Sequence, residues 1–327
     1  MKKYILFAAT VLALAACSND EENLTDGPVE ARISAGVNTP ETRAINNLWE
    51  ADEIGVMVTS AESSGMDKLY KNVKYATTTS NAASANFTAE GDGIFFQDAS
   101  ETVTFAAYAP YQTSAANVLP GTDGVISGST AEQSTREKQK AFDYIYASGA
   151  TASRSNPTVE FKDEHAFAHK MTRLILIVKT SEQDGFTAGQ VTNGEYSLSG
   201  LKHEGTFDVK SGTAAANTEG KTTNDWSLTT NSLKTDGETE QMTFTSILYP
   251  QTPGSTITFK AVINGQTYTN NTNINPALAA GKSYSYTITV KKLGLEVSGC
   301  TIVDWGNGTG GSGDATMQPC NNFTIKL

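Results

Sequence analysis

Apolar and polar residues alternate at every second position in several separate stretches of this 327-residue chain. The clearest is "SYSYTITVKK", residues 283–292, which places its aromatic and aliphatic residues on one face and its Ser and Thr residues on the other. Because successive side chains of a β-strand point to opposite faces, this period of two is typical of a half-buried strand. The pattern recurs over residues 103–109 and 257–263, so the sequence predicts a chain built from β-strands.

Long polar segments separate these strands, and no long Leu-, Glu- and Lys-rich helical pattern lies between them. Residues 112–140 and 211–240 are predicted to be large surface loops with short helices. Residues 174–178, "LILIV", are continuously apolar, as expected of a strand that is covered on both faces. Strands joined by loops favour β-sandwiches, with a domain boundary at "TSEQDG", residues 180–185.

A regular apolar strand near the N-terminus is followed by a bond that a trypsin-like protease would cut. Residues 29–37, "VEARISAGV", place five apolar side chains on one face: Val29, Ala31, Ile33, Ala35 and Val37. The Arg43–Ala44 bond lies a few residues later. Two interpretations remain open: Arg43 is an ordinary solvated loop residue, or the strand is temporary and cleavage after Arg43 releases it.

The first 17 residues have the layout of an export signal. Two lysines precede an apolar run, residues 4–16, that is too short for a permanent membrane helix. The run ends in "LAAC", which is similar to a bacterial lipobox and predicts lipid on Cys17; the alternative is an ordinary signal peptide with a chance cysteine. The acidic run 18–22 is expected to be a solvated tether, and it also resembles the acidic signal that sends some lipoproteins to the outer face of the outer membrane.

The formal net charge of −11 argues against binding to nucleic acid or to an anionic bilayer surface. With Cys17 lipidated, two cysteines remain, Cys300 and Cys320. An oxidising periplasm or cell exterior favours a disulfide between them, and two separate thiols are the alternative.

A search for catalytic residues yields no convincing set. His165 and His169 in "HAFAH" would share one face of a helix and could form a metal pair, although a strand-edge role for these histidines is the simpler interpretation. No G-x-S-x-G elbow is present, and no pair of carboxylates stands out as the two acids of a glycosidase. We therefore expect neither an enzyme nor a protein with a metal or other cofactor.

Several segments, taken in order along about 260 residues, resemble the fimbrillin family, the subunits of lipoprotein-derived fimbriae called type V pili. The most specific are the His-Lys-Met-Thr-Arg segment, residues 169–173, and "TIVDWG", residues 301–306. The full set is "LWEADEIGVMV" (48–58), "FAAYAPY" (105–111), "DYIYAS" (143–148), "FAHKMTRLIL" (167–176), "SLSGL" to "GTFD" (197–208), "ILYPQT" (247–252) and the segment 280–308.

The resemblance implies an all-β fold of two tandem transthyretin-like β-sandwich domains, residues 44–180 and 181–327. It also implies export as a lipoprotein, with residues 1–17 as the signal and 18–43 as a tether plus a removable strand. An Arg-specific protease would remove that strand, and other fimbrial subunits would fill its place by strand donation. The assembled fimbrium would serve adhesion to a host or bacterial surface ligand.

The C-terminal tail, residues 306–327, is the candidate donor. Phe323, Ile325 and Leu327 alternate with Thr324 and Lys326, and a Gly-rich segment precedes them. The alternative is a last strand that pairs inside its own domain. A Cys300–Cys320 disulfide would hold the tail close to the Cys300 strand and restrict donation.

A second functional hypothesis is a surface lipoprotein that never polymerises and binds glycans or host proteins. An exposed aromatic residue such as Trp226 could stack on a sugar ring. The competing interpretation is that Trp226 packs against its own domain.

Overall fold

The computed structural model describes residues 27–37, 49–180, 186–220, 222–236, 241–252, 257–274, 277–292 and 294–305. Within these ranges the chain forms 24 strands and five helices of three to five residues each, so the predicted all-β class is confirmed. The helices are α1 (Met66–Leu69), α2 (Arg136–Lys140), η1 (Asp163–His165), α3 (Ala188–Thr192) and α4 (Leu228–Asn231). None of them approaches the length and apolar character of a membrane span in the ranges described.

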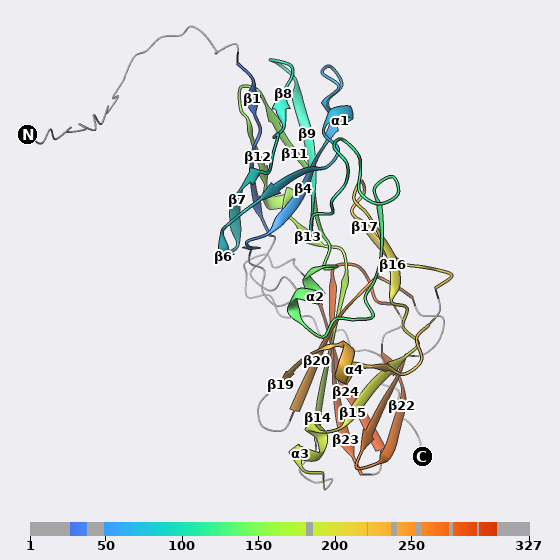
Figure 1. Cartoon of the computed structure of the whole chain (residues 1–327). Coiled ribbons are helices and arrows are strands. Elements are labelled where there is room, and N and C mark those ends of the chain that lie inside the picture. The colour runs from blue at the N-terminus through green and yellow to red at the C-terminus, as the bar shows by residue number, and fades with distance from the viewer. Residues whose placement is uncertain are drawn as a thin grey trace, which may run out of the picture.

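The largest sheet occupies one end of the molecule (Figure 1). Its strand order is β12 (Thr158–Phe161), β2 (Arg32–Gly36), β7 (Ser84–Ala89), β5 (Val73–Ala76), β4 (Glu53–Ser60), β9 (Thr102–Ala109), β11 (Ile145–Ser153) and β13 (Ala168–His169). Two short ladders accompany it, β1 (Val29–Glu30) with β8 (Phe95–Phe96) and β3 (Trp49–Glu50) with β6 (Ser80–Ala82). Their inward side chains form one apolar cluster that includes Trp49, Phe87, Phe105, Phe161 and Phe167.

Two sheets form the other end. One has the order β19 (Leu233–Asp236), β20 (Gln241–Leu248), β14 (Thr172–Thr180), β23 (Lys282–Lys291) and β24 (Gly294–Asp304). The other has the order β18 (Trp226–Ser227), β15 (Glu195–Ser199), β21 (Ile257–Ile263) and β22 (Gln266–Ile274). A second apolar cluster, with Leu176, Phe244, Phe259 and Tyr286 among its members, is buried between them.

The strand β14 differs from its prediction in two ways. The predicted domain boundary at residues 180–185 would place β14 in the first sandwich. In the structure β14 pairs with β20 and β23, which belong to the sheets at the other end. Its apolar run is not covered equally on both faces, because Leu174, Leu176 and Val178 are buried while Ile175 and Ile177 are only half-buried. The boundary segment itself, residues 181–185, lies outside the described residues.

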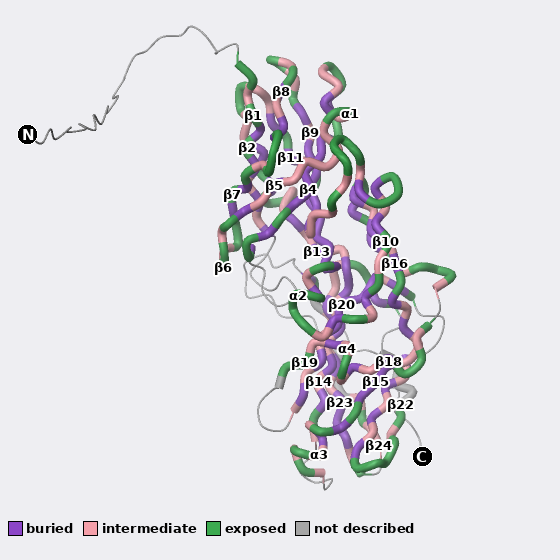
Figure 2. Tube along the Cα trace, viewed as in Figure 1, coloured by how far each residue is buried: buried purple, intermediate pink, exposed green. Residues whose placement is uncertain are grey.

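A further sheet, of three strands, lies between the two ends: β10 (Val125–Ser129), β16 (Glu204–Asp208) and β17 (Thr213–Ala216) (Figure 1). Figure 2 shows buried segments continuing through this middle region. The prediction of long loops was therefore wrong in part, because residues 112–140 and 211–240 contribute β10, β17, β18 and β19 as well as the expected short helices. β10 and β17 consist largely of Ser, Thr, Gly and Ala, and β18 and β19 are only two and four residues long, so none of them shows a sustained alternation of large apolar residues.

Close packing of an aromatic ring on glycine joins the middle sheet to β20. Gly128 and Gly205 are paired across β10 and β16, and a Cβ atom at Gly205 would lie 2.3 Å from Cγ of Tyr249. Tyr249 is fully buried in a third apolar cluster, which also contains Tyr144, Phe207 and Trp305. The absence of a side chain at Gly205 therefore lets the ring lie directly on the sheet.

We expect Gly205→Ala to lower the free energy of unfolding by about 1–3 kcal/mol, because the added methyl group overpacks this contact. Gly189→Ala is the matched control, since a Cβ there meets nothing within 4 Å and Gly189 lies in α3. Urea unfolding of both variants measures the difference. Equal stability of the two variants would contradict the packing argument.

Candidate functional site

The N-terminal strand β2 lies inside the largest sheet, with a neighbour on each side. It runs parallel to β12, with which it pairs from Arg32 to Ala35. It runs antiparallel to β7, with which it pairs from Ile33 to Gly36. We call the space that β2 fills between β12 and β7 the strand slot.

The side chains of residues 29–37 alternate between core and solvent as their sequence predicts. Ala31, Ile33, Ala35 and Val37 are only 2–6 % exposed, and Val29 is half-buried. Glu30 and Arg32 on the opposite face are exposed. The segment therefore contributes one complete apolar face to the first core, and a slip by one residue would turn that face outward.

Both neighbours of β2, which we also call the slot strand, place large apolar residues beside it. Ile33 lies level with Phe87 of β7 and Val159 of β12, and Ala35 lies level with Phe161. Val37 forms an isolated bridge with Phe167. On the β12 side the small Ala35 faces the large Phe161, whereas on the β7 side it faces Ala85.

Trp49 holds the slot strand from the core side. Its Nε1 donates a 3.0 Å hydrogen bond to the backbone oxygen of Ala35. Its ring meets Phe87 and Phe167 edge to face, with centroids 4.9 and 5.3 Å apart. In the sequence this tryptophan stands out only as part of a family segment, and its position shortly after Arg43, at the start of a strand, is the signal that could have indicated a role at the slot.

Several backbone and side-chain bonds fix the N-terminal end of the segment. The backbone N–H groups of Ala31 and Arg32 donate to the oxygens of Ile94 and Pro157, each over 2.8 Å. The guanidinium of Arg154 donates to the backbone oxygen of Gly27 over 2.9 Å. The segment is therefore integrated into the sandwich along its whole described length.

The two histidines of "HAFAH" have separate partners. His169 is buried in β13, with Nδ1 2.9 Å from a carboxylate oxygen of Asp143, and its ring stacks on Trp305 at 3.9 Å. His165 ends η1, and its Nδ1 lies 2.9 Å from the backbone oxygen of Ser148. Across the described ranges, no group of three His, Cys, Asp or Glu residues is placed to hold a metal ion. His169 therefore serves packing.

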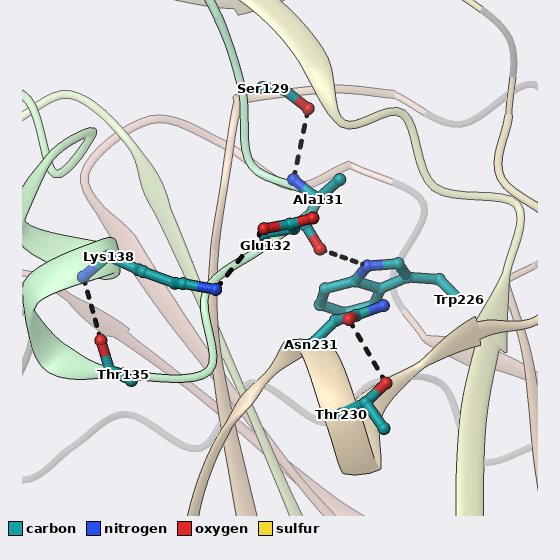
Figure 3. A network of polar contacts seen from close by, with 8 residues as sticks. All are labelled: Ser129, Ala131, Glu132, Thr135, Lys138, Trp226, Thr230 and Asn231. Carbon is teal, nitrogen blue, oxygen red and sulfur yellow. Dashed lines mark hydrogen bonds and ion pairs between the residues drawn. The ribbon is translucent and has the colours of Figure 1, made fainter.

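Trp226 is buried, which removes the surface aromatic residue that the glycan-binding hypothesis invoked. It is 3 % exposed, and its Nε1 donates to the backbone oxygen of Ala131 over 2.8 Å (Figure 3). His203 lies against its ring at 4.4 Å and contacts the hydroxyl of Thr130 through Nδ1. Trp226 thus packs against its own protein, the competing interpretation made from the sequence.

The other predicted site residues lie outside the described ranges. They are the lipidation site Cys17, the processing bond Arg43–Ala44 and the donor residues Phe323, Ile325 and Leu327. The predicted disulfide joins Cys300, on strand β24, to Cys320, which is also outside those ranges.

Comparisons with known proteins agree with this architecture. The family model described as "Fimbrillin-like" matches residues 42–305. A Bacteroides uniformis protein named "Putative fimbrium subunit Fim1C" is 33 % identical over 96 % of this chain and all of its own length. Crystal structures of a "putative cell adhesion protein" from Bacteroides ovatus and from B. uniformis are 28 % and 26 % identical. Each covers 86 % of this chain and 99 % or more of its own, with TM-scores of 0.70 and 0.64.

The packed sheets define a β-sandwich protein with a strand slot in its first sandwich. The chain belongs to the fimbrillin-like family. This is a family of fimbrial and adhesion structural proteins rather than of enzymes, which agrees with the prediction that the chain is not an enzyme.

Burial makes the stability of this region depend on pH. It lowers the pKa of His203 to about 4, whereas an unfolded histidine titrates near pH 6.5. The unfolded chain therefore binds a proton that the folded chain rejects, so stability is lost as the pH falls from about 6.5 toward 4. We expect this residue to lower the free energy of unfolding by about 2 kcal/mol between pH 7 and pH 5.

Urea unfolding at both pH values checks this expectation. His203→Gln should lose that part of the pH dependence, whereas His165→Gln, at a more exposed position, should retain it. The expectation fails if His203→Gln and the unmodified protein lose equal stability on acidification.

Proposed function

We propose that this protein is a fimbrial subunit that is exported as a lipoprotein, cut after Arg43 and assembled by strand donation into the vacated slot. Lipid on Cys17 would hold the precursor at the outer membrane until an Arg-specific protease acts. The processed chain would then start at Ala44 and join other fimbrial subunits in a cell-surface fimbrium. Family membership supports the fimbrial role, and the strand slot supports the mode of assembly.

The two-sided pairing of β2 is the observation that carries the proposal. Loss of this strand would leave unpaired backbone groups on β7 and on β12 at once. Among the described strands, β12 has β2 as its one ladder neighbour. An empty slot would therefore be a template for a new strand, which is the β-augmentation mode of recognition.

Burial energies show how strongly the slot favours an occupant. Full burial contributes about 1.5–3 kcal/mol for a side chain such as Ile33 or Val37 and about 0.8 kcal/mol for the methyl group of each alanine. The gross contribution of the four buried side chains is about 5–8 kcal/mol, an upper bound because unfolded chains already bury some surface. Ordering of an incoming strand would offset part of it.

The C-terminal tail is the proposed donor. Phe323, Ile325 and Leu327 repeat the period of two that the slot requires. If Cys300 and Cys320 form the proposed disulfide, only residues 321–327 extend past the bridge, and this length is still that of a typical strand. The ligand of the assembled fimbrium would be a host or bacterial surface molecule.

We expect an Arg-specific protease to cut the lipid-free precursor once, after Arg43, and the product to form multimers that survive mild denaturant. N-terminal sequencing of protein recovered from the cell surface should begin at Ala44. A surface protein that begins instead at a lipidated Cys17 would contradict processing for assembly. Monomers after complete cleavage would point to the non-polymerising alternative.

A pair of core substitutions tests whether residues 29–37 are discarded. Ile33→Ala should destabilise the precursor by about 2–5 kcal/mol but leave the processed multimer unchanged, because residue 33 is no longer present. Phe87→Ala, the matched control on β7, should destabilise the precursor and the multimer alike. Thermal unfolding of both forms measures this, and a multimer weakened by Ile33→Ala would show that the strand is retained.

A further inference from the structure

Cleavage after Arg43 does not by itself empty the slot. The backbone hydrogen bonds of residues 27–37 join this segment to the rest of the sandwich, and a cut after Arg43 breaks none of them. Loss of β2 would also uncover its four buried side chains, so the filled slot stays favoured after the cut. A cut precursor therefore keeps its strand almost all the time, and exchange requires a place where a new strand can begin.

The end of β2 near Val37 offers no such place. The backbone N–H of Val37 donates to Ala83, that of Phe167 donates to Gly36, and the indole of Trp49 donates to Ala35. The ladder with β7 is continuous up to the pair Gly36–Ser84. An incoming strand would have to break these bonds before it formed any.

The opposite end of β2 is open on the β7 side. The ladder stops at the pair Ile33–Phe87, although the register would next match Arg32 with Thr88. At that point β7 turns to β5, and Thr88 and Ala89 pair with Ala76 and Tyr75 instead. A surface hollow of about 410 Å³ occupies the gap, and both Arg32 and Thr88 line it.

The hollow has the two-sided character that a strand end requires. Its lining includes exposed polar residues, among them Glu30, Asn86 and Thr88. It also includes buried residues, among them Phe87 and Tyr75. An alternating segment such as "NFTIKL", residues 322–327, can direct apolar side chains toward the buried residues and polar side chains toward the exposed ones.

We infer that this hollow is the first contact site for the C-terminal tail of a second copy of the chain, and that exchange runs from the Ala31 end of β2 toward Val37. This inference rests on the proposed function. Each new bond to β7 would replace one bond to the outgoing strand, so the core is never uncovered. The tail of a second copy suits the site because its last seven residues match the slot in period and length.

The test uses the cut, lipid-free precursor, with Ile325→Asp in its own tail so that it cannot donate. A fluorescent peptide of residues 321–327 is added, and release of the fragment that contains residues 29–37 is followed in time. We expect the release rate to rise in proportion to the peptide concentration. A release rate that is independent of peptide would show that the strand leaves first and would overturn the inference.

Filling the hollow provides the site-specific arm of the test. Thr88→Trp and Thr158→Trp place a large side chain in the hollow from β7 and from β12, and each should slow release by about tenfold or more. Ser84→Trp is the matched control: it lies on the same strand, is also exposed and faces the other end of the ladder. The inference is overturned if Ser84→Trp slows release while the two hollow variants do not.

The amount of peptide captured after long incubation separates this inference from the proposed function. If the peptide is captured but the rates do not depend on its concentration, strand donation stands and the starting point is wrong. If no peptide is captured at any concentration, the tail is not the donor, and both the donor assignment and this inference fail.

Discussion

The pairing of one N-terminal strand with two neighbours of opposite direction is the constraint on which the first sandwich depends. β2 completes one sheet by joining β12 to β7, and it also supplies an apolar face to the core. A strand in such a position is not a surface addition, because its backbone bonds and its side chains both have partners. Its removal would therefore create a single, well-defined site for a segment of the same period and length.

The rest of the molecule holds the slot in place. β7 connects the slot to the rest of the sheet, since it pairs with β2 at one end and with β5 at the other. β5 continues the sheet through β4, β9 and β11 to β13. The middle cluster then connects β13 to the second group of sheets, because His169 of β13 stacks on Trp305 at the end of β24. The slot and strand β24 thus belong to one continuous packed framework.

The sequence predicted some features well and others poorly, for physical reasons that differ. The alternation over residues 29–37 was visible because each buried position is apolar and each exposed position is polar or Gly. The strands β10 and β17 were missed because they use Gly, Ser, Thr and Ala, whose burial depends on Tyr249 and other distant partners. The placement of β14 depends on pairing with β23, more than 100 residues away, which no local pattern reveals.

Trp49 gives the slot a property that the strand itself does not have. The proposed mature chain begins at Ala44, so this indole would remain after the original strand has gone. Its N–H would then face whichever backbone carbonyl occupies the place of Ala35. A donor seated one residue out of step would present the wrong edge to this group and leave a buried donor unsatisfied. The indole would thus act as a fixed gauge of alignment for every subunit added to the fibre.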